Sequence, residues 1–132
     1  MYAMNNAFKT YKQQGVLTAN PLELIVMLYE GCIKRLKIAS IAIEDKDYEQ
    51  ANESLQKSQR IVVELMNSLD LRFPIAKDLM MIYEFLIREI SACNASKDAQ
   101  RVSGVIDILN EMKDAWSQLA KSGIGSVAQI GE

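Results

Sequence analysis

The stretch NPLELIVMLYEGCIKRLKIASIAIED, residues 20–45, decides the fold of this chain. It opens with signals for a helix start, because Asn20 can cap, Pro21 suits the first helical position and Glu23 can complete a capping box. Its apolar residues recur at alternating spacings of three and four, which places them along one face of a helix. The residues on this face are Leu22, Ile25, Tyr29, Cys32, Leu36, Ala39 and Ile43. The spacing predicts a helix that packs along its length against another helix.

Three further segments repeat this spacing, and we call each such line of apolar positions a seam. The second seam consists of Ala51, Leu55, Ser58, Val62, Leu65 and Leu69. The third consists of Ala76, Leu79, Tyr83, Leu86, Ile90 and Cys93. The fourth consists of Val102, Val105, Leu109, Met112, Trp116 and Leu119. Four seams in one chain of 132 residues predict an all-α protein, a four-helix bundle in a single domain.

Local signals set the expected helix boundaries. Asp47 can cap the second helix, and Ser96 or Asp98 can cap the fourth. Pro74 suits the first turn of the third helix, and Asn94 can end that helix in a left-handed conformation.

The connections between these helices are short, and short connections force neighbouring helices to run antiparallel. We therefore expect an antiparallel up-down bundle over residues 20–121. Residues 1–19 are expected to form a short N-terminal helical segment, and residues 122–132 a flexible C-terminal tail.

Composition excludes several classes of partner and location. The formal net charge is −2, which gives no electrostatic reason to expect nucleic acid or an anionic membrane surface. The longest apolar stretch, residues 22–33, contains Glu23 and Glu30 and is too short to span a bilayer. No segment resembles a signal peptide. The sequence therefore predicts a cytosolic protein.

Chemistry-bearing residues are scarce. The chain has no histidine, so it lacks the commonest general base and the commonest metal ligand. There is no zinc spacing and no glycine-rich phosphate loop, so we expect neither an enzyme, nor a metal site, nor a cofactor. Cys32 and Cys93 lie on seams and are expected to be reduced core residues. Tyr29 and Tyr83 also lie on seams, where they could face each other or a buried acid.

The helices carry more apolar residues than their seams can use. Some of this surplus completes the core, and we assign Leu28, Ile61, Ile82 and Ile106 to it. The rest predicts an exposed groove between helices that accepts an amphipathic partner helix. The candidate partner-binding residues in the bundle are Leu24, Met27, Val63, Met66, Met81, Phe85 and Ile108.

Two aromatic residues of the N-terminal segment complete the candidate site. Phe8 and Tyr11 lie three residues apart in a segment too short to be a stable helix alone. Our hypothesis is that they fill the groove in the free protein and leave when a partner binds.

The sequence also resembles a known family. Val16-Leu17-Thr18-Ala19-Asn20-Pro21 and Met27-Leu28-Tyr29-Glu30-Gly31 are similar to the opening of FliS-type flagellin export chaperones, and weaker matches continue to Trp116. The resemblance implies an antiparallel helical bundle that binds the C-terminal segment of flagellin in the cytosol. It implies that binding prevents premature filament assembly and aids delivery to the export apparatus. It also implies neither catalysis nor a cofactor, with the segment around Tyr11 near the client.

One alternative stays open at this level. A generic regulatory four-helix bundle could self-associate through the same apolar groove. We expect a monomer or a weak homodimer in either case.

Overall fold

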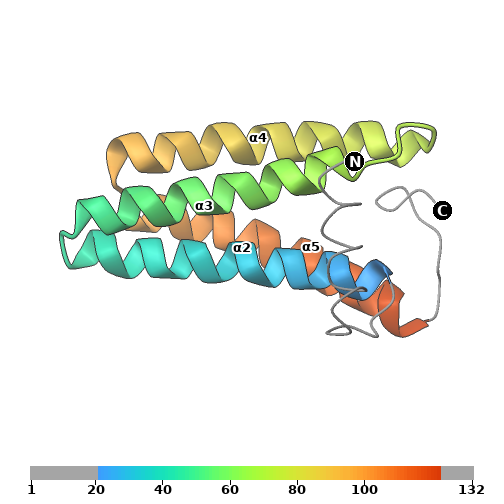
Figure 1. Ribbon diagram of the computed structural model, residues 1–132, viewed down its shortest axis with the longest axis horizontal. Coiled ribbons are helices and arrows are strands. Elements are labelled where there is room, and N and C mark those ends of the chain that lie inside the picture. Colours follow the sequence, from blue (N-terminus) through green and yellow to red (C-terminus); the bar gives the residue numbers. More distant parts are fainter. Residues whose placement is uncertain (1–20, 123–132) are drawn as a thin grey trace, which may run out of the picture.

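The computed structural model describes residues 21–122 and shows four helices. They are α2 (Pro21–Glu44), α3 (Tyr48–Asn67), α4 (Pro74–Ser96) and α5 (Ala99–Ser122). Successive helices run in opposite directions and form an elongated bundle, which Figure 1 shows from the side. The predicted all-α four-helix bundle is confirmed. The predicted N-terminal segment, residues 1–19, lies outside the described residues, as does the predicted tail beyond Ser122.

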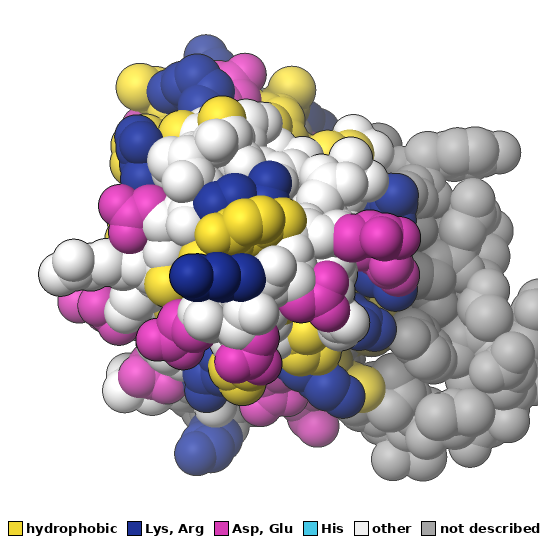
Figure 2. Space-filling model, turned by 90° about the vertical axis from the view of Figure 1, so that its left-hand side faces the viewer, with side chains coloured by type: hydrophobic (Ala, Val, Ile, Leu, Met, Phe, Trp, Pro, Cys, Tyr) yellow, Lys and Arg dark blue, Asp and Glu magenta, His cyan; other side chains and the backbone are white. Residues whose placement is uncertain are grey.

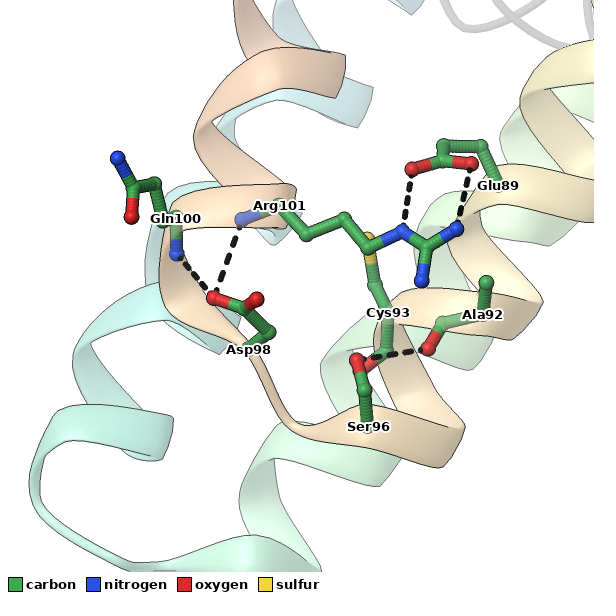
Figure 3. Close-up of polar contacts among 7 residues, drawn as sticks. All are labelled: Glu89, Ala92, Cys93, Ser96, Asp98, Gln100 and Arg101. Carbon is green, nitrogen blue, oxygen red and sulfur yellow. Dashed lines mark hydrogen bonds and ion pairs between the residues drawn. The ribbon is translucent and has the colours of Figure 1, made fainter.

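Capping side chains begin two of the helices as the sequence predicts. Asp47 Oδ1 accepts a hydrogen bond from the Gln50 backbone N–H at 3.2 Å at the start of α3. Asp98 Oδ1 accepts from the backbone N–H groups of Gln100, at 3.0 Å, and Arg101, at 3.4 Å, before α5 (Figure 3). These bonds satisfy amide groups that the helix itself leaves without an acceptor.

The end of α4 differs from the prediction at Asn94. This residue stays helical, and its side-chain Nδ2 donates to Asn52 Oδ1 on α3 at 2.7 Å. The left-handed residue is instead Lys97, with φ 51°, whose backbone N–H donates to the Cys93 carbonyl at 2.8 Å. The helix therefore continues beyond Asn94, whose side chain contacts the neighbouring helix, and the chain turns three residues later at Lys97.

The seams form the core. Every seam residue of α2, α3 and α4 is buried, and in α5 only Met112 and Leu119 are half-buried. Tyr29 and Tyr83 face each other, with their hydroxyl oxygens 2.5 Å apart. The Trp116 indole N–H donates to the Tyr29 hydroxyl at 3.2 Å. This bonded group joins α2, α4 and α5 inside the bundle and satisfies polar atoms that would otherwise be costly to bury.

Both cysteines are free and buried, as the sequence predicts. The Cys32 thiol lies 3.5 Å from the Ser58 carbonyl oxygen on α3. Burial raises the pKa of the Cys32 thiol to about 12. A thiol with so high a pKa remains protonated at neutral pH and behaves as a small hydrophobic group.

The helices do not pack equally. Helix α2 packs extensively against both α3 and α5, whereas the contact between α4 and α5 is the sparsest of these helix pairs. Helices α2 and α4 therefore stand on opposite corners of the bundle. Figure 1 shows α5 diverging from α4 toward the end of the bundle where α4 begins and α5 finishes. This divergence leaves one flank of α4 uncovered by its neighbour.

Candidate partner-binding surface

Helix α4 carries more exposed large apolar side chains than any other described helix. They are Ile75, Met81, Ile82 and Phe85, with exposed fractions of 57%, 67%, 37% and 42%. Ile75, Ile82 and Phe85 are separated by seven and three residues, so they share one face of the helix. An apolar face of this kind on a small protein is typical of a binding site.

This face of α4 looks toward α5. Glu89, four residues beyond Phe85, lies on the same face and accepts two hydrogen bonds from Arg101 of α5, at 2.6 and 3.3 Å (Figure 3). Seven residues beyond Arg101, Ile108 occupies the side of α5 turned to α4, and it is half-buried. We use the name α4–α5 groove for the apolar surface formed by the exposed Ile75, Ile82 and Phe85 of α4 and the half-buried Ile108 of α5.

A second apolar surface lies on the other flank of α4. Gln59 of α3 donates through Nε2 to the Ile87 carbonyl, at 3.0 Å, and to Ser91 Oγ, at 2.7 Å. Val63 and Met66 follow Gln59 by one and two helical turns, so they face α4 as well. Towards the connection between these helices the surface opens into a hollow of about 690 Å³. We call this surface the α3–α4 groove; the hollow is lined by Met66, Asn67, Leu69, Asp70, Leu71, Arg72 and Met80.

An ion pair shapes the rim of that hollow. Arg72 donates through Nε to both carboxylate oxygens of Asp70, at 2.9 and 3.0 Å, and through Nη2 at 2.5 Å. The hydrogen bonds from Arg72 hold the pKa of the Asp70 carboxyl below its ordinary value. Asp70 is therefore charged at neutral pH and fixes the connection between α3 and α4, beside which Leu71 is left exposed.

The structure distributes the predicted partner-binding residues over several places. Val63 and Met66 line the α3–α4 groove, and Phe85 and Ile108 line the α4–α5 groove. Met81 lies on the outer face of α4, between the two grooves. These predicted residues therefore surround one helix, α4, rather than lining a single groove.

The remaining predicted residues lie elsewhere. Met27 is exposed on the outer face of α2, on the opposite side of the bundle from Met81. Leu24 is 3% exposed, so its assignment to an exposed surface is wrong. It is buried because α2 packs closely on both of its neighbours, which covers the columns beside its seam. Phe8 and Tyr11 lie outside the described residues.

Sequence reasoning also missed exposed residues. Ile82 was assigned to the core but is exposed, because α5 diverges from α4 and does not cover this flank. Ile75 and Leu71 are absent from the predicted site, and both are more than half exposed. The seven-and-three spacing that joins Ile75, Ile82 and Phe85 was the available signal, since it marks a second apolar column beside the third seam.

The end of the bundle that carries the α2–α3 and α4–α5 connections has a different surface. Figure 2 shows acidic and basic side chains interspersed there, with hydrophobic groups only as small patches between them. Such a mixed surface is typical of solvated protein and offers no continuous apolar contact. This end of the bundle is therefore not part of the candidate partner-binding surface.

Two further features are absent from the described residues, 21–122. None of the helices there is both long enough and apolar enough to cross a membrane. Within the same range, no group of three or more cysteine or acidic side chains could hold a metal ion.

Comparisons with known proteins agree with one another. The family described as "Flagellar protein FliS" matches residues 4–123. The flagellar secretion chaperone FliS of Bacillus subtilis is 34% identical over 120 residues, which cover 91% of this chain and 90% of that protein. The protein of the same name from Vibrio cholerae is 30% identical, with 88% of this chain and 90% of that protein covered. A crystal structure of a bacterial flagellar chaperone has a TM-score of 0.72 at 20% identity, covering 89% of this chain and 97% of that one.

Proposed function

This chain belongs to the flagellar protein FliS family, a family of flagellar secretion chaperones, and from this premise we propose what it binds and where. We propose that it binds the C-terminal segment of flagellin in the cytosol, prevents premature polymerisation and assists assembly of the flagellum. It works by stoichiometric burial of the client, without catalysis and without a cofactor. The loaded complex is then the form that export-apparatus components receive.

The observation that carries this proposal is the apolar surface around α4. A single helix presents Met81 on its outer face, the α4–α5 groove on one flank and the α3–α4 groove on the other. A client segment that is partly helical and partly extended can place apolar side chains in both grooves as it crosses α4. The methionines Met66, Met80 and Met81 are flexible and polarisable, so they adapt to client side chains of different shapes.

The energetics require a surface of this extent. A disordered client that orders on binding loses conformational entropy worth several kcal/mol, which apolar burial must exceed. Burial contributes about 25 cal/mol for each Å² of apolar surface removed from water, so one small patch is insufficient. Two grooves on either side of one helix supply a longer continuous contact than either groove alone.

Calorimetry tests the proposal. The full chain is titrated with the C-terminal segment of flagellin from the same organism, and one-to-one binding with a strongly negative heat-capacity change is expected. The double variant Ile82→Asp/Phe85→Asp should weaken binding about 100-fold, because it places two charges in the contact. The control is Ile41→Asp, which changes an isoleucine of α2 that is 60% exposed and lies away from α4.

Each result has a definite meaning. An absence of binding by the unaltered chain, together with concentration-dependent dimerisation, would favour a self-associating bundle and overturn the proposal. Equal losses in the double variant and in Ile41→Asp would show that the client does not use α4 in particular. Met66→Asp is less decisive than Phe85→Asp because Met66 packs partly against the core, so its replacement also lowers stability.

The proposed role of the N-terminal segment has its own test. If Phe8 and Tyr11 fill a groove in the free protein, deletion of residues 1–15 should change client affinity, because it removes a competitor or a contact. The same calorimetric titration measures this change. An unaltered affinity would contradict the hypothesis without affecting the assignment of the client to α4.

A further inference from the structure

A third groove lies between α2 and α5, on the far side of the bundle from α4. It has a volume of about 420 Å³ and is walled by Ile33, Ile38 and Ile41 of α2, with Asn110 of α5 opposite. Ile41 is 60% exposed, which is unusual for an isoleucine in a helix that buries most of its other apolar residues. Toward the end of α2 the groove continues into an adjoining hollow of about 340 Å³, which Ile38 and Ile41 also line.

Three lysines set this groove apart from those around α4. Lys34, Lys37 and Lys113 line it together with a single carboxylate, Glu30. None of the three ammonium groups forms an ion pair with any residue in the described range 21–122. In this part of the groove the three lysines outnumber the one carboxylate, and Asp45 and Asp47 line only the adjoining hollow. The groove therefore has an apolar floor and basic sides.

From this geometry we propose that the α2–α5 groove docks a second partner, an amphipathic helix that carries aliphatic side chains flanked by carboxylates. The aliphatic side chains would pack on Ile38 and Ile41, and the carboxylates would pair with Lys34, Lys37 and Lys113. Complementary charges of this kind select the partner and orient it in the groove. Because α2 and α4 occupy opposite corners of the bundle, this partner and the proposed client can bind at the same time.

The charge pattern favours an acidic helix over two other occupants. Membrane surfaces are usually recognised by clusters of about four to eight basic residues, whereas this groove has three and an acid beside them. A second copy of the chain would have to bring an acidic helix face to these lysines. The carboxylates of Asp45 and Asp47 lie in the adjoining hollow of each copy and could serve this purpose, so dimerisation is an outcome that the test must exclude.

Two designed peptides provide the test. Both are amphipathic helices of about 18 residues with the same leucine face, and they differ only in carrying glutamate or lysine beside it. The full chain should bind the glutamate peptide at least about tenfold more tightly, and the preference should shrink as salt is raised. The variant Lys34→Glu/Lys37→Glu/Lys113→Glu should reverse the preference. Methyl NMR shifts should map the contact to Ile38 and Ile41.

Controls separate this proposal from the function proposed above. Ile82→Asp/Phe85→Asp should leave glutamate-peptide binding unchanged, and a saturating flagellin segment should not displace the peptide. Thermal unfolding of the triple variant should match the unaltered chain, because all three lysines reach solvent. Equal binding of both peptides, or shifts mapped to α4, would overturn the proposal. So would lysine-dependent binding to phosphatidylserine vesicles without peptide binding, or lysine-dependent dimerisation in the ultracentrifuge.

Discussion

Helices α2 and α4 have similar apolar sequence patterns but differ in how far the residues beside their seams are buried. Each has a complete buried seam and a surplus of apolar residues beside it. In α2 the surplus at Leu24, Ile33 and Ala42 is buried, whereas in α4 the surplus at Ile82 and Phe85 is exposed. The difference lies in the neighbours, because α2 packs closely on two helices and α4 on one. The apolar residues beside the seam of α4 are therefore exposed because the adjacent helix α5 diverges from α4.

The largest expected effect is a difference in stability between a variant of the buried apolar residues of α2 and a variant of the exposed apolar residues of α4. Leu24→Ala should lower the free energy of unfolding by about 3 kcal/mol, because it removes a fully buried side chain and leaves a cavity. Phe85→Ala should cost less than about 1 kcal/mol, since the ring already lies partly in water. Urea denaturation followed by circular dichroism measures both values.

The same two variants can also contradict this difference between the helices. If Phe85→Ala were as destabilising as Leu24→Ala, the outer column of α4 would belong to the core. The α4–α5 groove would then be a packed contact rather than a client site. If Phe85→Ala instead lowered client affinity without lowering the free energy of unfolding, Phe85 would be assigned to binding.

The difference between the buried thiols of the two helices at high pH is a smaller effect. Burial raises the pKa of Cys32, on α2, to about 12 and that of Cys93, on α4, to about 11, from an ordinary value of 9.0. The folded state holds each proton more tightly than the unfolded state does. The stabilisation is therefore complete below pH 9 and is lost as pH rises through the folded pKa, by about 1.4 kcal/mol per unit for each thiol.

Single alanine variants measure this difference. The free energy of unfolding of Cys32→Ala and Cys93→Ala is followed from pH 7 to pH 11.5, each relative to its own value at pH 7. Cys32→Ala should remove more of the alkaline loss, because its window extends to higher pH. The reverse order would indicate that the thiol of α4 is the better shielded of the two.

The smallest effect concerns how α4 is held to α5. Glu89→Gln breaks the ion pair with Arg101, whose side chain is 45% exposed, and should lower the free energy of unfolding only slightly, because solvent screens the pair. The control Glu84→Gln changes an exposed glutamate on another face of α4. A loss of several kcal/mol in Glu89→Gln alone would show that this pair, rather than core packing, positions α4.

The sequence predicted the fold well, because a seam shows which face of a helix packs against the other helices of the bundle. The sequence also predicted the helix caps at Asp47 and Asp98, because a capping side chain bonds to backbone groups only a few residues away. The errors at Leu24 and Ile82 share one cause. Periodicity does not state how far apart two neighbouring helices stand, and that separation decides whether a flanking column is covered. The prediction that Asn94 ends α4 was wrong for a related reason. The side chain of Asn94 bonds to Asn52, which is 42 positions away, and local sequence does not reveal such a partner.

The bonded group of Tyr29, Tyr83 and Trp116 gives the protein a built-in optical signal. Trp116 is the single tryptophan of the chain, and it is 8% exposed with its indole N–H bonded to α2. Its emission therefore reports one location, the interior contact between α5 and α2 behind the α4–α5 groove. A client that tightens or loosens this end of the bundle changes the wavelength and intensity of that emission. Unfolding exposes this indole to water, so it can be followed by fluorescence in unlabelled protein.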